Sequence, residues 1–176
     1  MMPSAIRFGA LSSVLSMLVL LVCALPVRSA PGLTESELKA VFLLRLPQFV
    51  SWPDEQSATV FCVAPTSELS GLLQQIVAAE PKGREVRPLI ADQVSTCDVV
   101  FASVGERESE QAFEQGVLWV SDRPGFAREG GMVELKRHGA RMRLVINLAA
   151  LESAGLKASS KLLQLAEVVG DLSGDV

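Results

Sequence analysis

The sequence predicts a single α/β domain, with a mainly parallel central sheet of about six strands flanked by helices and a C-terminal β-hairpin at the edge of the sheet. Three observations indicate this class. Short apolar runs alternate with helical patterns through residues 34–120, an order typical of parallel strands joined by helices. Two alternating runs flank Arg137-His138-Gly139-Ala140 and indicate the hairpin. No internal repeat, linker or low-complexity segment divides the chain.

Caps and apolar residues at helical spacing predict five helices. Thr34 and Glu37 form a capping box at the start of the first helix, which Pro47 kinks or ends. Ser67 caps the second helix, Gly116 follows the third, and Gly155 stops the fourth. The predicted helices span residues 35–50, 67–77, 106–114, 148–154 and 159–169, and the tail at 170–176 is expected to fray.

Short β-type runs separate these helices. The first is apolar almost throughout, which suits a strand covered on both faces. The run at 85–89 is weaker than the others, and the two runs of the hairpin alternate apolar and polar residues. The predicted strands span residues 59–63, 85–89, 98–102, 117–120, 132–136 and 141–146.

The first 29 residues have the three-part layout of a secretory signal peptide. A short stretch carrying Arg7 precedes an apolar run at 8–25, and small residues follow at 26–30. Cleavage after Ser29 would leave an exported, soluble periplasmic domain of residues 30–176. An uncleaved membrane anchor is the alternative, but the run is near the lower limit for spanning a bilayer and is interrupted by Ser12, Ser13 and Ser16, which favours cleavage.

Export changes the charge that a partner meets. Arg7 and Arg28 leave with residues 1–29, so 16 basic residues become 14 against 20 acidic ones, a formal net charge of −6. No polybasic run remains. Nucleic acid and anionic lipid surfaces are therefore not expected as partners.

Cysteine and histidine usage argues against an enzyme. Cys62 and Cys97 are the cysteines of the mature chain, and in an exported protein such a pair is more often a disulfide than a metal site or a nucleophile. Two buried free thiols are the alternative. His138 is the only histidine, and there is no GxSxG motif or His/Cys ligand cluster. We therefore expect no catalytic residues, metal or cofactor.

The loop after the strand at 117–120 contains the first candidate contacts for a partner or a small ligand. Asp122 and Arg123 would present charge, with Phe126 as an apolar anchor. The alternative is a structured turn with Phe126 in the core. Gly130 and Gly131 allow positive φ before the hairpin, and a strand follows them where a phosphate-binding loop would need a helix.

Four further residues are candidate contacts. Arg141 and Arg143 share one face of a strand, where they either meet an acidic partner or are solvated with Glu134 as a cross-strand counter-charge. Asn147 either caps the following helix or contacts a ligand. Trp52 is either a lid on the core or part of an exposed docking patch.

Three segments of the sequence contain motifs that are specific when they occur together in this order. They read LKAVFLLRLPQFVSWP at 38–53, VSDRPGFA at 120–127 followed by GGM at 130–132, and RLVINL at 143–148 followed by AGLK at 154–157 and SSKLL at 159–163. In this order after a signal peptide, they resemble the YfiR family of small periplasmic proteins. With the Cys62 region, the resemblance spans essentially the whole mature chain.

The resemblance implies a compact, non-enzymatic α/β domain. It also implies a periplasmic regulator that binds the sensor domain of an inner-membrane protein. In the best-known system that protein is a diguanylate cyclase held inactive by the regulator, so release raises cyclic di-GMP and favours biofilm. An outer-membrane lipoprotein sequesters the regulator in that system.

The resemblance also bears on the cysteines and leaves the partner open. Cys62 and Cys97 match a disulfide pair of that regulator, whereas its second pair is missing because no cysteine follows Cys97. A different membrane target, such as a histidine kinase, remains an alternative, as does a role as a small-ligand-binding sensor component. The sequence also leaves open the direction of regulation and whether the chain forms a homodimer.

Overall fold

The computed structural model describes residues 32–53, 58–103, 113–139 and 141–170. Residues from Leu33 onward group into one unit. The predicted signal peptide, most of the predicted helix at 106–114 and the end of the tail lie outside the described residues, so these three predictions stay predictions.

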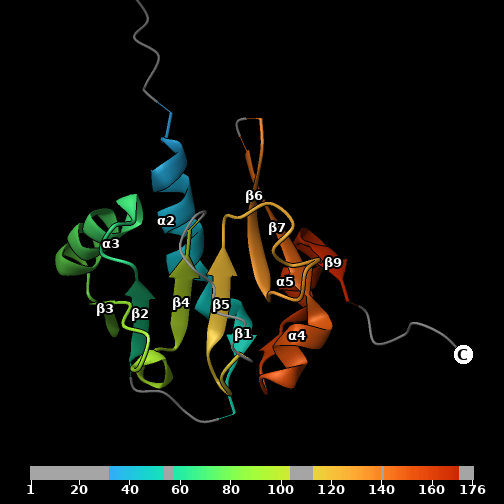
Figure 1. The fold of residues 1–176 in the computed structure, drawn as a ribbon. Coiled ribbons are helices and arrows are strands. Elements are labelled where there is room, and N and C mark those ends of the chain that lie inside the picture. Colours follow the sequence, from blue (N-terminus) through green and yellow to red (C-terminus); the bar gives the residue numbers. More distant parts are fainter. Residues whose placement is uncertain (1–31, 54–57, 104–112, 140, 171–176) are drawn as a thin grey trace, which may run out of the picture. The chain divides into compact units, whose positions relative to one another are not determined.

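Seven strands form one sheet in the order β3-β2-β4-β5-β6-β7-β9 (Figure 1). Every neighbouring pair is parallel except the β6–β7 hairpin. The prediction of a mixed α/β fold on a mainly parallel sheet is confirmed, with seven strands in place of about six. Their bounds are β2 Thr59–Val63, β3 Arg84–Pro88, β4 Val99–Ala102, β5 Leu118–Ser121, β6 Val133–His138, β7 Arg141–Asn147 and β9 Glu167–Val169.

The C-terminal edge of the sheet differs from the prediction. The expected helix at 159–169 is a shorter helix, α5 Ser160–Leu165, followed by β9. Ala166 turns the backbone to an extended conformation, and β9 then pairs in parallel with Val145–Asn147 of β7. The hairpin therefore lies one strand inside the edge. Apolar runs of this length fit either a helix or a strand, and here pairing with β7 decides the outcome.

The N-terminal helix shows its sequence signals directly. In α2, Glu35–Arg45, the Glu37 amide donates to Thr34 Oγ1 at 3.2 Å and the Thr34 amide to Glu37 Oε2 at 2.6 Å, which confirms the capping box. The predicted helix at 35–50 ends early, because Pro47 lies in a 3-10 turn, η1 Leu46–Phe49. The chain continues into β1 Val50–Ser51, which pairs antiparallel with β8 Lys157–Ala158.

The remaining helices begin near their predicted caps. The Ser67 hydroxyl accepts from the Leu69 amide at the start of α3 Glu68–Ala79. Asn147 caps α4 Leu148–Ser153, and Ser159 caps α5. A short 3-10 turn, η2 Val94–Thr96, leads into β4.

The two faces of the sheet carry different clusters. Buried residues of α2 and α3 join one apolar cluster with the strand residues of the same face, among them Phe61, Phe101 and Leu118. The opposite face carries a smaller cluster around Cys62, Cys97 and Val100. The order of elements typical of parallel sheets predicts helices on both faces, whereas α2 and α3 both contribute to the cluster on one face.

The smaller cluster contains the expected disulfide. Cys62 and Cys97 are bonded, and the two residues are 2% and 4% exposed. The bridge joins β2 to the residue two positions before β4, and β2 and β4 are neighbouring strands of the sheet. The expectation of a disulfide is thereby confirmed over that of two free thiols.

Reduction of this bridge should lower stability substantially. It closes a loop of 35 residues, so its loss should lower the free energy of unfolding by up to about 3–4 kcal/mol. Urea unfolding with and without reductant measures this difference. The double variant Cys62→Ala/Cys97→Ala is the control and should be insensitive to reductant. Equal midpoints for the oxidised and reduced wild type would contradict the prediction.

Candidate functional site

The β5–β6 loop, residues 122–131, is held against the sheet by its own backbone and by one aromatic ring. The Ser121 hydroxyl donates to the Ala102 carbonyl at 2.6 Å and accepts from the Arg123 amide at 3.1 Å. The Gly131 amide donates to the Phe126 carbonyl at 2.8 Å. Gly130 has φ +103°, so the positive φ expected of the glycine pair is present there. The loop is therefore a tightly closed turn.

Phe126 anchors this loop from inside. It is 1% exposed, and its ring lies 6.3 Å from that of Phe113 in an edge-on arrangement. The Arg123 guanidinium lies over the ring, 5.6 Å from its centre, and pairs with Glu129. Phe126 is thus buried, as the alternative of a structured turn with Phe126 in the core describes, and its surface is not available as an apolar anchor for a partner. Burial of a full aromatic ring stabilises the loop more than a surface contact could.

Asp122 belongs to a charge network that spans the chain. Lys39 Nζ lies 2.7 Å from Asp122 Oδ2 and 2.8 Å from Glu35 Oε1, and Arg137 pairs with Glu35 from the hairpin. Burial lowers the pKa of Lys39, but its hydrogen bonds to Asp122 and Glu35 raise it further, so the net pKa lies above its usual 10.5. Hydrogen bonds from Lys39 and Arg137 hold the pKa of Glu35 below 4.5. The charge of Asp122 is thus compensated within the protein.

A polar pocket of about 400 Å³ lies beside this network. It is located at the carboxyl end of β5, where we expected a site from the position of the loop. Pro124 and Gly125 line it from the β5–β6 loop, and Arg128 and Lys136 add positive charge. Glu35, Asp122 and Glu134 also line it, so side chains of both charges face a space large enough for a small polar molecule.

Asn147 and Trp52 have structural partners. Asn147 Oδ1 accepts from the Ala150 amide at 3.0 Å, as the capping interpretation requires, and its Nδ2 donates to the Ala127 carbonyl at 2.9 Å. The Trp52 indole donates to the Gly116 carbonyl at 2.8 Å and packs against the main cluster. Both observations favour the structural alternatives for these residues.

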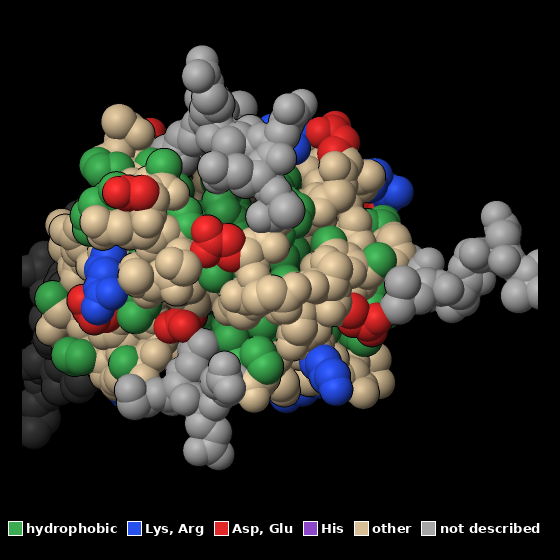
Figure 2. All heavy atoms as spheres, turned by 60° about the horizontal axis from the view of Figure 1, so that its bottom comes forward, with side chains coloured by type: hydrophobic (Ala, Val, Ile, Leu, Met, Phe, Trp, Pro, Cys, Tyr) green, Lys and Arg blue, Asp and Glu red, His purple; other side chains and the backbone are tan. Residues whose placement is uncertain are grey.

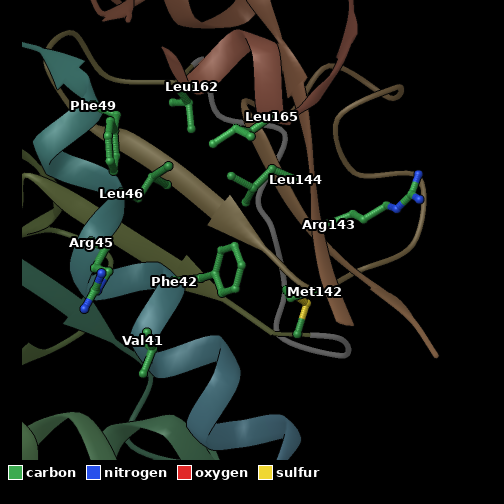
Figure 3. Close-up of a pocket in the computed structure, with 10 residues that line it drawn as sticks. All are labelled: Val41, Phe42, Arg45, Leu46, Phe49, Met142, Arg143, Leu144, Leu162 and Leu165. Atoms are coloured by element: carbon green, nitrogen blue, oxygen red, sulfur yellow. The ribbon is translucent and has the colours of Figure 1, made fainter. Parts of the chain in front are cut away.

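An apolar groove of about 430 Å³ runs between α2, β7 and α5. Figure 3 shows Phe42, Leu144 and Leu165 turned toward one another across it, while the Arg143 guanidinium points away. Leu165 is 73% exposed at its rim. Ten residues line the groove: Val41, Phe42, Arg45, Leu46, Phe49, Met142, Arg143, Leu144, Leu162 and Leu165.

The hairpin carries a cationic face, defined here as Lys136, Arg141 and Arg143. All three side chains are exposed, and Lys136 stands directly opposite Arg143 in the ladder. Within the described part of the chain, no acidic side chain pairs with any of them. Glu134 was predicted as a cross-strand counter-charge for these arginines. It is only 4% exposed and lies opposite Val145 in the ladder.

The structure brings only some of the predicted residues together. Asn147 bonds to the β5–β6 loop that contains Asp122, Arg123 and Phe126, whereas Trp52 bonds to the segment before β5. Sequence reasoning missed the groove and the Lys39 network. The spacing of Glu35 and Lys39 on one helix face was a usable signal, but their partners lie far away in the chain.

Among the described residues, the charged side chains that face the viewer at the end of the sheet away from the hairpin tip are not gathered into one patch (Figure 2). Figure 2 turns that end forward, and the acidic and basic side chains drawn there are spread among apolar ones. The candidate surfaces are therefore the polar pocket, the apolar groove and the cationic face. No group of His, Cys, Asp and Glu suited to a metal ion occurs among the described residues, and no helix among them is long and apolar enough to span a bilayer.

Comparisons with known proteins place the chain at family level. The family model described as YfiR/HmsC-like matches residues 36–167. A solved structure of a conserved domain protein from Vibrio cholerae O1 biovar eltor str. N16961 is similar at 14% identity with a TM-score of 0.48. That alignment covers 78% of this chain and 60% of the other, so the chain spans less than two thirds of that protein's length. No curated protein matches the sequence.

Gly131→Ala should destabilise the protein by displacing Phe126. A Cβ at this position would lie 2.4 Å from Phe126 Cζ, which forces the ring or the turn to move. We expect a loss of about 1–3 kcal/mol in urea unfolding, as for other overpacked cores. Gly71→Ala in α3 is the matched control, because no atom lies within 4 Å of its new Cβ; it should gain about 0.5–1 kcal/mol. Equal effects of the two substitutions would contradict this account of the loop.

Lys39→Met should expose the dependence of the β5–β6 loop on the charge network. The side chains of Lys39 and Asp122 are 16% and 12% exposed, so removing the cation should lower the free energy of unfolding by about 1–3 kcal/mol at pH 7. Lys157→Met, at an exposed lysine, is the control and should change it by less than about 0.5 kcal/mol.

The effect of Lys39→Met should also depend on pH. Glu35 has a lowered pKa, so its contribution is present above 4.5 and is lost as the pH falls through its folded value. Lys39 has a raised pKa, so its contribution is present below 10.5 and is lost as the pH rises through its folded value. Unfolding measured across this range should show the largest difference from wild type between the two limits. A difference that is independent of pH would contradict the role of the network.

Proposed function

The chain belongs to the YfiR/HmsC-like family, and from this membership we propose that it is a periplasmic regulator that binds and represses an inner-membrane signalling protein. At family level these proteins are periplasmic, non-catalytic regulators of cyclic di-GMP signalling. The target proposed for this chain is the periplasmic sensor domain of a diguanylate cyclase.

The single observation that carries the proposal is the family match over residues 36–167. It covers α2, the disulfide, the β5–β6 loop, the hairpin and α5. The signal-peptide pattern of residues 1–29 supports action outside the cytoplasm. The arrangement of surfaces supports protein binding, because an apolar groove with an exposed leucine at its rim lies beside charged residues.

Deletion of the gene tests the proposal in the organism. Loss of a repressor should raise intracellular cyclic di-GMP and increase surface attachment, both of which can be measured directly. Complementation with the complete gene should restore the wild-type level. A deletion that leaves both quantities unchanged would exclude a cyclase as the target.

Removal of residues 1–29 is the matched control for the site of action. A gene that encodes only residues 30–176 should produce protein in the cytoplasm and fail to complement the deletion. Full complementation by this shortened gene would contradict a periplasmic role. Cross-linking of the exported protein in intact membranes then identifies the target and separates a cyclase from another sensor, such as a histidine kinase.

The polar pocket favours a second candidate function, a small-ligand-binding sensor component. Its position at the carboxyl ends of the strands and its Lys136 side chain, for which no ion pair is present among the described residues, suit a small molecule with an anionic group. Thermal-shift measurements with acidic amino acids and nucleotides test this function. A shift at micromolar concentration that Lys136→Ala abolishes would support it, and the absence of any shift would argue against it.

A further inference from the structure

We propose that the outer edge of β7 binds an extended segment of the partner protein in which acidic and apolar residues alternate. This inference rests on the proposed function, since it specifies the chemistry of the regulated partner. Three observations carry it: an incomplete strand edge, a cationic face on one side of that edge, and the apolar groove on the other.

The edge is free because β9 is shorter than β7. β7 spans Arg141–Asn147, but β9 pairs only with Val145–Asn147. Along Arg141–Leu144 the structure places β6 on one side and, among the described residues, no strand on the other. Figure 1 shows this part of the hairpin extending beyond the neighbouring strands.

The backbone groups of two residues point to this free edge. The Asn147 amide donates to the Met132 carbonyl at 2.9 Å, which fixes which residues of β7 bond to β6. In an antiparallel ladder the bonded residues alternate, so Met142 and Leu144 direct their N–H and C=O groups outward. An added strand can satisfy these groups, as in other cases of β-strand addition.

The side chains beside the edge differ between the two faces. Arg141 and Arg143 lie on the cationic face with Lys136 of β6. Met142 and Leu144 lie on the other face, where they line the apolar groove with Leu165. Because side chains of a strand alternate between faces, a bound segment would place every second residue against the arginines and the others toward the groove.

The positive charges of Arg141 and Arg143 favour one of three possible partners for the β7 edge. A second copy of this chain added along the same edge would bring its own arginines close to Arg141 and Arg143, which like-charge repulsion disfavours. An anionic lipid surface would meet the cations but offers no extended backbone whose C=O and N–H groups match the outward N–H and C=O groups in register. An acidic, alternating peptide segment satisfies the cations, the backbone groups and the groove together.

The test uses the full gene product, exported and purified, with a short synthetic peptide in which glutamate and valine alternate. The peptide should bind, and its effects on backbone amide signals in nuclear magnetic resonance spectra should centre on β7 and the groove. Two control peptides, one with lysine in place of glutamate and one with the same residues in two blocks, should bind at least about tenfold more weakly.

Protein variants separate charge from the backbone edge. Arg141→Glu/Arg143→Glu should weaken peptide binding by about tenfold or more, while Lys82→Glu/Lys157→Glu, a matched reversal at exposed lysines elsewhere, should leave it unchanged. Met142→Pro removes an outward N–H without removing a bond to β6, so it should weaken binding beyond Met142→Ala. Thermal unfolding of each variant confirms that the fold is kept.

Several results would overturn the inference. They are equal binding of the acidic and basic peptides, no binding of the alternating peptide, unchanged binding by the double arginine variant, or spectral changes away from β7. Arginine-dependent sedimentation with phosphatidylglycerol vesicles in the absence of peptide binding would assign the face to a membrane, and arginine-dependent dimers would assign it to a second copy.

Complementation distinguishes failure of this inference from failure of the proposed function. If deletion raises cyclic di-GMP and Arg141→Glu/Arg143→Glu complements as well as wild type, partner binding at the β7 edge is excluded and the proposed regulatory function is retained. If deletion has no effect while the alternating peptide still binds through β7, the proposed function is wrong and the inference that β7 binds an acidic, alternating segment is retained.

Discussion

The brevity of the pairing between β5 and β6 determines where the surfaces of this protein lie. Only Val120 and Ser121 of β5 pair with β6, at Val133 and Glu134. The chain then leaves the sheet as the β5–β6 loop, so β6 continues without β5 beside it and carries β7 with it. The protruding hairpin, its cationic face and one wall of the apolar groove all follow from this early end to the ladder.

The β5–β6 loop makes that arrangement rigid. Phe126 fills the space under Gly131, and the Ala127 amide lies 3.4 Å from the buried Glu134 carboxylate of β6. Asn147 bonds to the Ala127 carbonyl from β7. The loop is thus attached to both strands of the hairpin at its base, while the tip remains exposed. A rigid base with an accessible edge lowers the entropy lost when a partner binds.

Local signals in the sequence were sufficient for most elements and insufficient for the site. The capping box of Thr34 and Glu37, the cap at Asn147 and the hairpin turn depend on residues close in sequence, and all are present. β9 was missed because its conformation depends on pairing with β7. The Lys39–Asp122 ion pair joins residues 83 positions apart, and no local pattern predicts such a contact.

The predicted contact residues differ in whether the fold already uses their side chains. Asp122, Phe126 and Asn147 have polar or apolar character typical of binding residues, but the fold uses each of them internally. A sequence shows which side chains can bind, whereas burial and internal pairing decide which remain available.

Arg141 and Arg143 differ from those residues in a way that matters for function. A like-charge pair such as Lys136 and Arg143 directly opposite in a hairpin is unfavourable for the free protein, and no ion pair in the described part of the chain involves either side chain. A bound acidic segment would relieve that repulsion, so binding gains from a strain that the free protein bears. Because exposed charges are screened by salt and only a short stretch of edge is open, the proposed complex would be reversible and sensitive to ionic strength.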